Sequence, residues 1–109
     1  MNYVITGIVV KGDQYGRKLG YPTVNLKLDA EETPPQGVYS GTAVLEGKEY
    51  RAGILINPNG KVEAHLIGYN GDAYGKVVTL RVEKFLRHYK KFDTEEELIL
   101  QIKKDIEQC

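Results

Sequence analysis

Hydrophobic and polar positions alternate along most of the chain and predict β-strands joined by turns. Val24, Leu26 and Leu28 alternate with polar residues, and residues 61–67 repeat the pattern. A period of two places the apolar residues of a strand on one face, so both segments read as half-buried strands. By the same reasoning, strands are expected over residues 3–10, 22–28, 37–45, 49–56, 61–67 and 77–85.

Turn-forming residues separate these segments. Asn57-Pro58-Asn59-Gly60 is a strong turn signal, because proline presets one backbone angle and Asn-Gly tolerates positive φ. Residues 46–48 and 69–72 predict two further turns, whereas residues 11–20 form a longer loop punctuated by glycine. Residues 31–36 make a polar connection.

The hydrophobic period changes from two to that of a helix near residue 93. Asp93 to Glu97 form a capping box, in which Thr94 can accept a hydrogen bond from the Glu97 amide. An apolar stripe at helical spacing follows at Leu98, Ile99, Ile102 and Ile106. The chain is therefore expected to be mainly β, a small six-stranded antiparallel β-barrel of the Greek-key type with one C-terminal α-helix. The helix is expected to cover one opening of this single domain, residues 1–109.

Composition narrows the class of partner. The chain has 109 residues, with 15 Lys and Arg against 15 Asp and Glu, so its formal net charge is zero. General nucleic-acid or anionic-membrane binders normally carry a basic excess, so neither partner is expected. The beginning of the chain lacks a signal-peptide pattern, and no apolar run reaches membrane-spanning length. Cys109 is the single cysteine. A cytoplasmic monomer without an internal disulfide is expected.

The loop at residues 12–20 is a first candidate site. Its glycines let the backbone approach a ligand closely, and its basic residues would attract phosphate. It fits neither the Walker pattern nor the dinucleotide fingerprint, and a solvated turn-rich loop explains the same composition. The residues concerned are Gly12, Gly16 and Gly20 together with Lys11, Arg17 and Lys18.

Two further candidates lie on predicted strands. Thr23 and Asn25 share one strand face, where a hydroxyl and an amide oxygen could ligate a hard cation. Glu63 shares a face with His65, and a carboxylate on a rigid strand can serve as a general base. The alternative in both cases is that polar side chains of half-buried strands simply face water.

Basic and aromatic residues interleave in residues 85–92, the fourth candidate. Arg87, Tyr89 and Phe92 could stack on a planar ring or pair with phosphate. A basic connector whose aromatic residues pack beneath the helix is an equally good interpretation.

Taken in order, these segments resemble the riboflavin kinase domain, which occurs alone in many eukaryotes and at the C-terminus of bacterial bifunctional FAD synthetases. Residues 16–26, Gly-Arg-Lys-Leu-Gly-Tyr-Pro-Thr-Val-Asn-Leu, match the family signature G-R-x-L-G-[FY]-P-T-A-N-L, with Val24 in place of alanine. Shorter matches follow at Gly37-Val38-Tyr39, Val62 to Leu66, Asp72 to Gly75, Phe85-Leu86-Arg87, Lys91-Phe92, and Leu98, Gln101, Ile102 and Asp105.

The resemblance implies ATP-dependent phosphorylation of riboflavin at its ribityl 5′-hydroxyl to give FMN, with Mg²⁺ as cofactor and ATP as co-substrate. It implies that Thr23 and Asn25 bind the metal and that Glu63 is the catalytic base. The flavin would lie against Arg87, Tyr89 and Phe92, next to the start of the helix. The nucleotide would contact Gly12, Arg17, Lys18, Gly20, Pro22, Thr23 and Asn25.

The chain departs from the family between its middle strands. The family usually has N-I-G-x-x-P-T-F and a sizeable loop, whereas residues 53–60 run directly into a tight hairpin here. This departure alters the wall expected beside the flavin and leaves the metal and base positions intact. It motivates the alternative of a non-catalytic flavin- or nucleotide-binding module. If the chain is a fragment of a bifunctional enzyme, a nucleotidyltransferase domain is expected before Met1.

Overall fold

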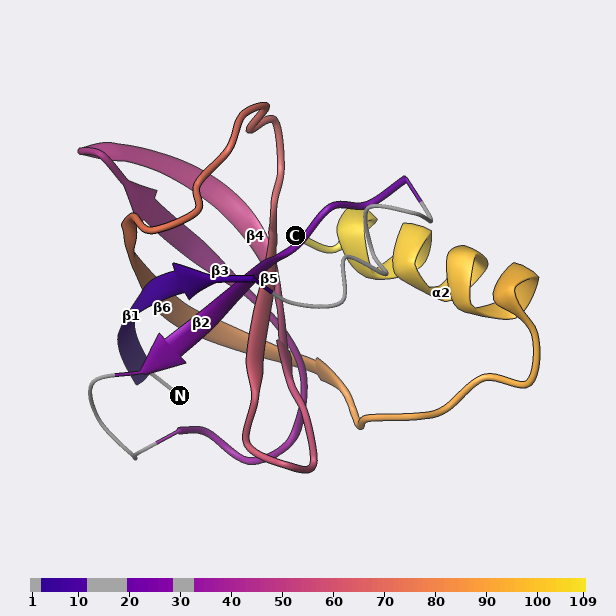
Figure 1. Ribbon diagram of the computed structural model, residues 1–109. Coiled ribbons are helices and arrows are strands. Elements are labelled where there is room, and N and C mark those ends of the chain that lie inside the picture. Colours follow the sequence, from indigo (N-terminus) through magenta and orange to yellow (C-terminus); the bar gives the residue numbers. More distant parts are fainter. Residues whose placement is uncertain (1–2, 12–19, 29–32) are drawn as a thin grey trace.

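The structure, a computed structural model, describes residues 3–11, 20–28 and 33–109 and has the predicted six strands and one helix (Figure 1). β2 begins two residues later than predicted and β6 continues two residues further, to Arg87. The elements are β1 (Tyr3–Val10), β2 (Val24–Leu28), β3 (Gly37–Leu45), β4 (Lys48–Ile56), β5 (Val62–Leu66), β6 (Val77–Arg87) and α2 (Glu95–Glu107).

The strands close into an antiparallel barrel in the order β1-β2-β5-β4-β3-β6. Hairpins join β3, β4 and β5, and β6 returns to pair with β3, which is the Greek-key arrangement. The predicted fold class is therefore confirmed. Closure also brings β2 beside β5, with Asn25 opposite Glu63 in the register. Two of the candidate segments, distant in sequence, thus become neighbours.

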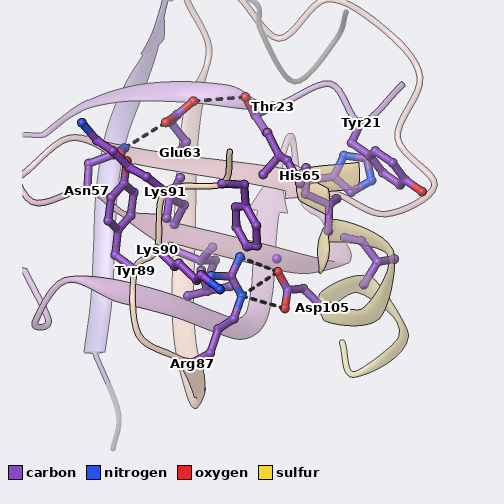
Figure 2. A pocket seen from close by; sticks show the side chains of 18 residues that line it. Tyr21, Thr23, Asn57, Glu63, His65, Arg87, Tyr89, Lys90, Lys91 and Asp105 are labelled. Carbon is purple, nitrogen blue, oxygen red and sulfur yellow. Dashed lines mark hydrogen bonds and ion pairs between the residues drawn. The ribbon is translucent and has the colours of Figure 1, made fainter. Parts of the chain in front are cut away.

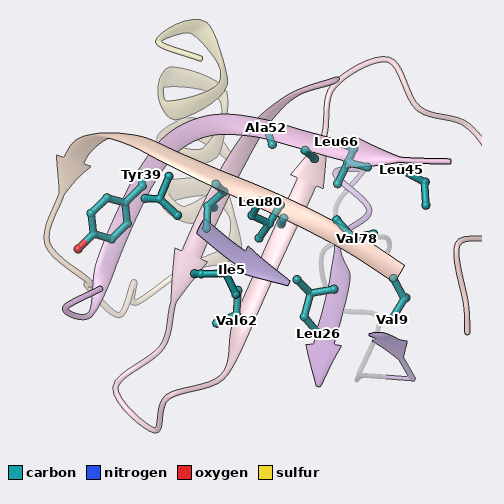
Figure 3. Close-up of a cluster of buried hydrophobic side chains, with 14 of the residues drawn as sticks. Ile5, Val9, Leu26, Tyr39, Leu45, Ala52, Val62, Leu66, Val78 and Leu80 are labelled. Atoms are coloured by element: carbon teal, nitrogen blue, oxygen red, sulfur yellow. The ribbon is translucent and has the colours of Figure 1, made fainter. Parts of the chain in front are cut away.

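Apolar side chains fill the interior of the barrel (Figure 3). Ile54, Val78 and Leu80 are completely buried, and the alternate positions of each strand point away from them. A six-stranded barrel is narrow enough for its own side chains to occupy the interior. Polar chemistry is therefore confined to the outer face of the wall and to the loops.

Gly41 marks the closest approach of two strands. The register of β3 against β6 shifts between Ser40 and Gly41. A Cβ built on Gly41 would lie 2.0 Å from the carbonyl oxygen of Arg81, well inside van der Waals contact. The tight β3–β6 seam therefore needs a residue without a side chain at this position.

The helix begins as the capping box predicts, because Thr94 Oγ1 accepts a hydrogen bond from the Glu97 amide at 3.2 Å. Its other end lies against the outer face of β4. Ile106 Cδ1 would be 3.4 Å from a Cβ on Gly53, and Arg51 Nε donates to the Cys109 carbonyl oxygen at 3.0 Å. The prediction that the helix covers an opening is wrong, since α2 stands beside the wall (Figure 1).

The apolar stripe explains this placement. A half-buried stripe needs a neighbouring surface, and the glycine in β4 leaves room there for an isoleucine of the helix. The periodicity reports only that one helix face is covered and does not specify by what. Among the described residues, no helix is both long and apolar enough to span a membrane.

Candidate active site

A cavity of about 460 Å³ lies between the outer face of the barrel wall and α2. This volume is within the usual range for small-molecule sites. β5, the adjoining part of β4 and the segment before β2 form its floor, while the segment after β6 and the helix form the opposite wall (Figure 2). The residues that line it are Tyr21, Thr23, Val38, Gly53, Ile54, Leu55, Asn57, Glu63, His65, Arg87, Tyr89, Lys90, Lys91, Phe92, Leu98, Ile102, Asp105 and Ile106.

Glu63 occupies the polar end of the cavity. The alternation of β5 points Val62 and Ala64 inward, so Glu63 projects from the outer face. Thr23 Oγ1 lies 3.5 Å from Glu63 Oε1 and can donate to it, and Asn57 Nδ2 donates to Oε2 at 2.9 Å (Figure 2). The structure thus brings Thr23 and Glu63, which lie 40 residues apart in sequence, to one cavity.

Asn25 stands beside this pair without lining the cavity. It is the register partner of Glu63 on β2, and inward-facing Leu26 follows it. Its side chain therefore belongs to the same outer face as Glu63. Within the described part of the chain, the residues that line the cavity include Thr23 and not Asn25.

His65 connects the floor to the segment before β2. Its Nδ1 lies 2.7 Å from the Pro22 carbonyl oxygen, which can only accept, so Nδ1 carries the proton. The imidazole also meets the Tyr21 ring edge-to-face, with centroids 5.8 Å apart. Pro22 and the exposed Gly20 lie at this side of the site, whereas the predicted nucleotide contacts Gly12, Arg17 and Lys18 fall outside the described residues.

Arg87 is held by the helix. Its Nε lies 3.1 Å from both carboxylate oxygens of Asp105, and its Nη2 donates to Oδ2 at 2.9 Å. Gln101 Nε2 donates to Asp105 Oδ1 at 3.0 Å, which leaves the buried carboxylate fully paired. The ion pair of Arg87 therefore attaches the helix to the barrel. Its predicted role against a flavin stays a prediction.

The opposite wall is aromatic and basic. Phe92 has the Arg87 guanidinium 5.6 Å and the Lys90 ammonium 5.3 Å from its ring centroid. Tyr89 and Lys91 line the same wall, and Leu98, Ile102 and Ile106 supply apolar helix surface. A planar ring that carries an anionic group would suit this combination of apolar surface and positive charge.

Two polar residues of the site do not follow from the sequence reasoning above. The turn signal accounts for Asn57 only as a turn residue, although it continues the outward positions Gly53 and Leu55 of β4. The family pattern includes Asp105 as a helix residue and does not indicate its Arg87 partner. The strand parity could have found Asn57, whereas nothing local identifies the pairing of Arg87 with Asp105.

The donor atoms at and beside the floor suit a hard cation. Thr23 and Glu63 offer a hydroxyl and a carboxylate at the cavity, and Asn25 offers an amide oxygen on the neighbouring strand position. Mg²⁺ is held by oxygens together with water and substrate phosphates. Over residues 3–11, 20–28 and 33–109 there is no cluster of three or more His, Cys, Asp or Glu that could hold a metal alone. The residues present therefore fit a metal that arrives with a phosphate ligand.

Fold and cavity define the class: a small Greek-key barrel whose cavity lies outside the wall, between the wall and a C-terminal helix. The chain belongs to the riboflavin kinase family. The family model described as "Flavokinase: Riboflavin kinase" matches residues 1–109, the whole length.

Named relatives agree with this assignment. The chain is 33% identical to the bifunctional riboflavin kinase/FMN adenylyltransferase of Bacillus subtilis, over 94% of this chain and 36% of that protein. It is also 33% identical to the RNA-binding riboflavin kinase RibR of Bacillus subtilis, over 94% of this chain and 48% of the relative. The chain thus spans only between about a third and a half of these relatives' length.

Solved structures share the fold. A Streptococcus pneumoniae structure named a macrolide-efflux protein has a TM-score of 0.87 and 32% identity, covering 95% of this chain and 37% of that one. The riboflavin kinase of Trypanosoma brucei has a TM-score of 0.72 and 25% identity, covering 97% and 76%. The likeness extends over the barrel and the helix in both cases.

Proposed function

We propose that this chain transfers the γ-phosphoryl group of Mg-ATP to the ribityl 5′-hydroxyl of riboflavin and so forms FMN. Membership of the riboflavin kinase family supports riboflavin and ATP as the substrates. The observation that carries the proposal is the position of Glu63, whose carboxylate lies in the cavity beside the Thr23 hydroxyl and opposite an aromatic, basic wall.

Glu63 acts as the base. The 5′-oxygen attacks the γ-phosphorus, a P–O bond forms, and the bond to the β,γ-bridging oxygen breaks as ADP leaves. The hydroxyl proton passes to the Glu63 carboxylate. Phosphoryl transfer depends mainly on holding the two oxygens in line and on stabilising charge. A carboxylate on a rigid strand, held by a neighbouring amide at 2.9 Å, is well suited to the positioning.

Thr23 and Asn25 hold the metal and the nucleotide phosphates. Bound Mg²⁺ would neutralise negative charge on the transferred group. The register places Asn25 directly opposite Glu63, so a phosphate bound on β2 would lie next to the base on β5. In this proposal Gly12, Arg17, Lys18, Gly20 and Pro22 complete the nucleotide site.

The flavin ring lies against the opposite wall. Tyr89 and Phe92 offer aromatic faces, and half-buried Leu98, Ile102 and Ile106 complete an apolar surface on α2. Burial of such surface favours a flat, largely apolar ring. Arg87 contributes to this wall in two ways: its guanidinium lies near the Phe92 ring, and its ion pair with Asp105 holds the helix in position.

Formation of FMN from riboflavin and Mg-ATP, followed by chromatography, tests the proposal. Glu63→Gln is expected to lower kcat by about 10²–10⁴-fold and to leave flavin affinity nearly unchanged, since the base is lost and the shape is kept. Glu49→Gln, an exposed glutamate of β4, is the matched control and should retain activity.

Other outcomes discriminate the alternative. The tight hairpin at residues 57–60 is the feature that favours a non-catalytic flavin-binding module. Absence of FMN together with tight flavin binding would select that module. Equal losses of kcat and flavin affinity in Glu63→Gln would show that Glu63 serves binding or folding.

A further inference from the structure

The hairpin between β4 and β5 places an unassigned amide against the proposed base. Asn57 follows β4 directly, and both polar groups of its backbone are hydrogen-bonded. Its N–H donates to the Lys61 carbonyl oxygen, and its carbonyl oxygen accepts from the Gly60 N–H, each at 2.9 Å. Asn59 Oδ1 accepts from the Lys61 amide at 3.1 Å. Asn57 is therefore fixed to the end of the β4–β5 ladder.

The neighbouring acceptor atoms determine which way the side-chain amide of Asn57 is oriented. Its Nδ2 lies 2.9 Å from Glu63 Oε2 and 3.5 Å from the Lys61 carbonyl oxygen. An ionised carboxylate and a carbonyl only accept hydrogen bonds, so the NH₂ group must face them. Asn57 thus donates to one defined oxygen of Glu63.

The two oxygens of Glu63 are consequently in different situations. Oε2 is occupied by Asn57 at 2.9 Å, whereas Oε1 lies 3.5 Å from Thr23 Oγ1, at the outer limit of a hydrogen bond. The terminal torsion of a glutamate is broad, so a carboxylate without a donor would rotate. The bond from Asn57 selects one orientation and turns Oε1 toward β2.

The turn itself does not require the Asn57 side chain. In the part of the chain that the structure describes, the only non-glycine residue with positive φ is Glu46, and the left-handed position of this hairpin is Gly60, at φ +83°. Any residue at position 57 could make these two backbone hydrogen bonds, except that proline lacks the N–H. Its side chain nevertheless lines the cavity beside Glu63.

We infer that Asn57 is a positioning residue, which holds Oε2 of Glu63 so that Oε1 receives the proton of the substrate hydroxyl. This inference rests on the proposed function. It assigns a use to the Asn57 side chain, which the turn does not require and which lines the cavity beside Glu63.

Matched substitutions on one hairpin provide the test. Asn57→Asp and Asn59→Asp make the same chemical change two positions apart, and aspartate at residue 59 can still accept from the Lys61 amide. Asn57→Asp replaces a donor to Glu63 by an acceptor, and Asn57→Ala removes the donor without adding charge. We expect both Asn57 variants to lower kcat by about tenfold or more, with the KM for riboflavin changed less than about threefold.

The control variant should keep kcat within about twofold of the unaltered protein. A second readout needs no activity: the Glu63 Cδ resonance in protein labelled with ¹³C-glutamate, assigned by its loss in Glu63→Gln. It should move in both Asn57 variants and stay in place in Asn59→Asp. Equal effects of the two positions on kcat and on this resonance would overturn the inference. If the unaltered protein forms no FMN, the proposed function fails, and an unmoved resonance would still separately refute the contact.

Discussion

Arg87, at the end of β6, forms an ion pair with Asp105, in the last turns of α2. The guanidinium contacts both carboxylate oxygens, and the shortest distance, from Nη2 to Oδ2, is 2.9 Å. The Asp105 side chain is 8% exposed and that of Arg87 23%. Both line the cavity, so the pair joins the barrel to the helix that forms the opposite wall. The wall of the site is therefore tied to the barrel by a buried ion pair between residues of two different elements.

Arg87→Met should lower the free energy of unfolding by about 2–4 kcal/mol, because it leaves the buried Asp105 carboxylate with Gln101 as its remaining side-chain partner. Urea denaturation measures the loss. Lys76→Met is the control, since the Lys76–Glu46 pair is similarly short, at 2.7 Å, but 41% and 62% exposed. Because that pair is solvent-exposed, the variant should unfold at nearly the same urea concentration as the unaltered protein. Equal losses of unfolding free energy in the two variants would show that burial of the Arg87–Asp105 pair does not determine its contribution to stability.

Cys109 should report whether the helix leaves the barrel in that variant. Burial raises the pKa of the Cys109 thiol, and its Sγ donates to the Asp105 carbonyl oxygen at 3.2 Å. Because the thiolate is the reactive form, a thiol reagent at mildly alkaline pH should react slowly with the folded protein. Arg87→Met should raise the rate severalfold toward that of urea-unfolded protein. An unchanged rate would mean that the helix stays in place without the ion pair.

The local parts of the fold follow directly from sequence patterns. The alternation of Val62, Glu63 and Ala64 gives both the strand and the direction in which the carboxylate points. Thr94 gives the helix start, since a cap depends on residues only three positions apart. Closure of the barrel makes neighbours of β2 and β5, and this pairing, which strand periodicity alone does not specify, brings Thr23 beside Glu63.

Long-range partners could not be predicted in this way. The basic and aromatic pattern around Arg87 indicates a ligand and a packing role equally well, and only the position of α2 shows that its charge meets Asp105. That position in turn places Ile106 against Gly53 on the outer face of the wall. Periodicity identifies which face of an element is covered, whereas the covering surface is set by packing between distant segments.

Glu83 should make folding stability depend on pH in the acid range. Hydrogen bonds from Arg51 and Thr42, at 2.8 and 2.9 Å, hold the pKa of Glu83 below its ordinary value. A lowered pKa favours the folded state above the ordinary glutamate range, and the benefit is lost as pH falls through the lowered value. Glu83 is 41% exposed, so Glu83→Gln should cost less than about 1 kcal/mol at pH 7.

The pH profile of unfolding is the measurement. The difference between Glu83→Gln and the unaltered protein should begin to shrink near the ordinary glutamate pKa, about 4, where the unfolded state takes up the proton. It should vanish below the lowered pKa, where the carboxylate is protonated in both states. A difference that stays constant from pH 7 to pH 3 would contradict an origin in ionised Glu83.

Gly41→Ala should disrupt the β3–β6 seam. The added Cβ would lie 2.0 Å from the Arg81 carbonyl oxygen, and backbone cannot move aside as a side chain can. We expect a loss of about 3 kcal/mol or more in urea denaturation. Gly53→Ala is the matched control: its Cβ would first meet Ile106 and Cys109 side-chain atoms, at 3.4 and 3.7 Å, and should cost less than about 1 kcal/mol. Similar stabilities of the two variants would contradict the close approach of the strands.

Asn25→Ala should weaken the dependence of FMN formation on magnesium. Asn25 is opposite Glu63 in the β2–β5 register and on its outer face, although it does not line the cavity of the described residues. If its amide oxygen ligates the metal, its removal should raise the half-saturating Mg²⁺ concentration by about tenfold, as loss of one oxygen ligand lowers affinity. Initial rates of FMN formation across a magnesium titration measure this, with Asn59→Ala as the control that lacks a metal role. An unchanged titration would remove Asn25 from the metal site and leave Thr23, directly before β2, as the proposed ligand, because the Thr23 hydroxyl alone of the two reaches the cavity beside Glu63.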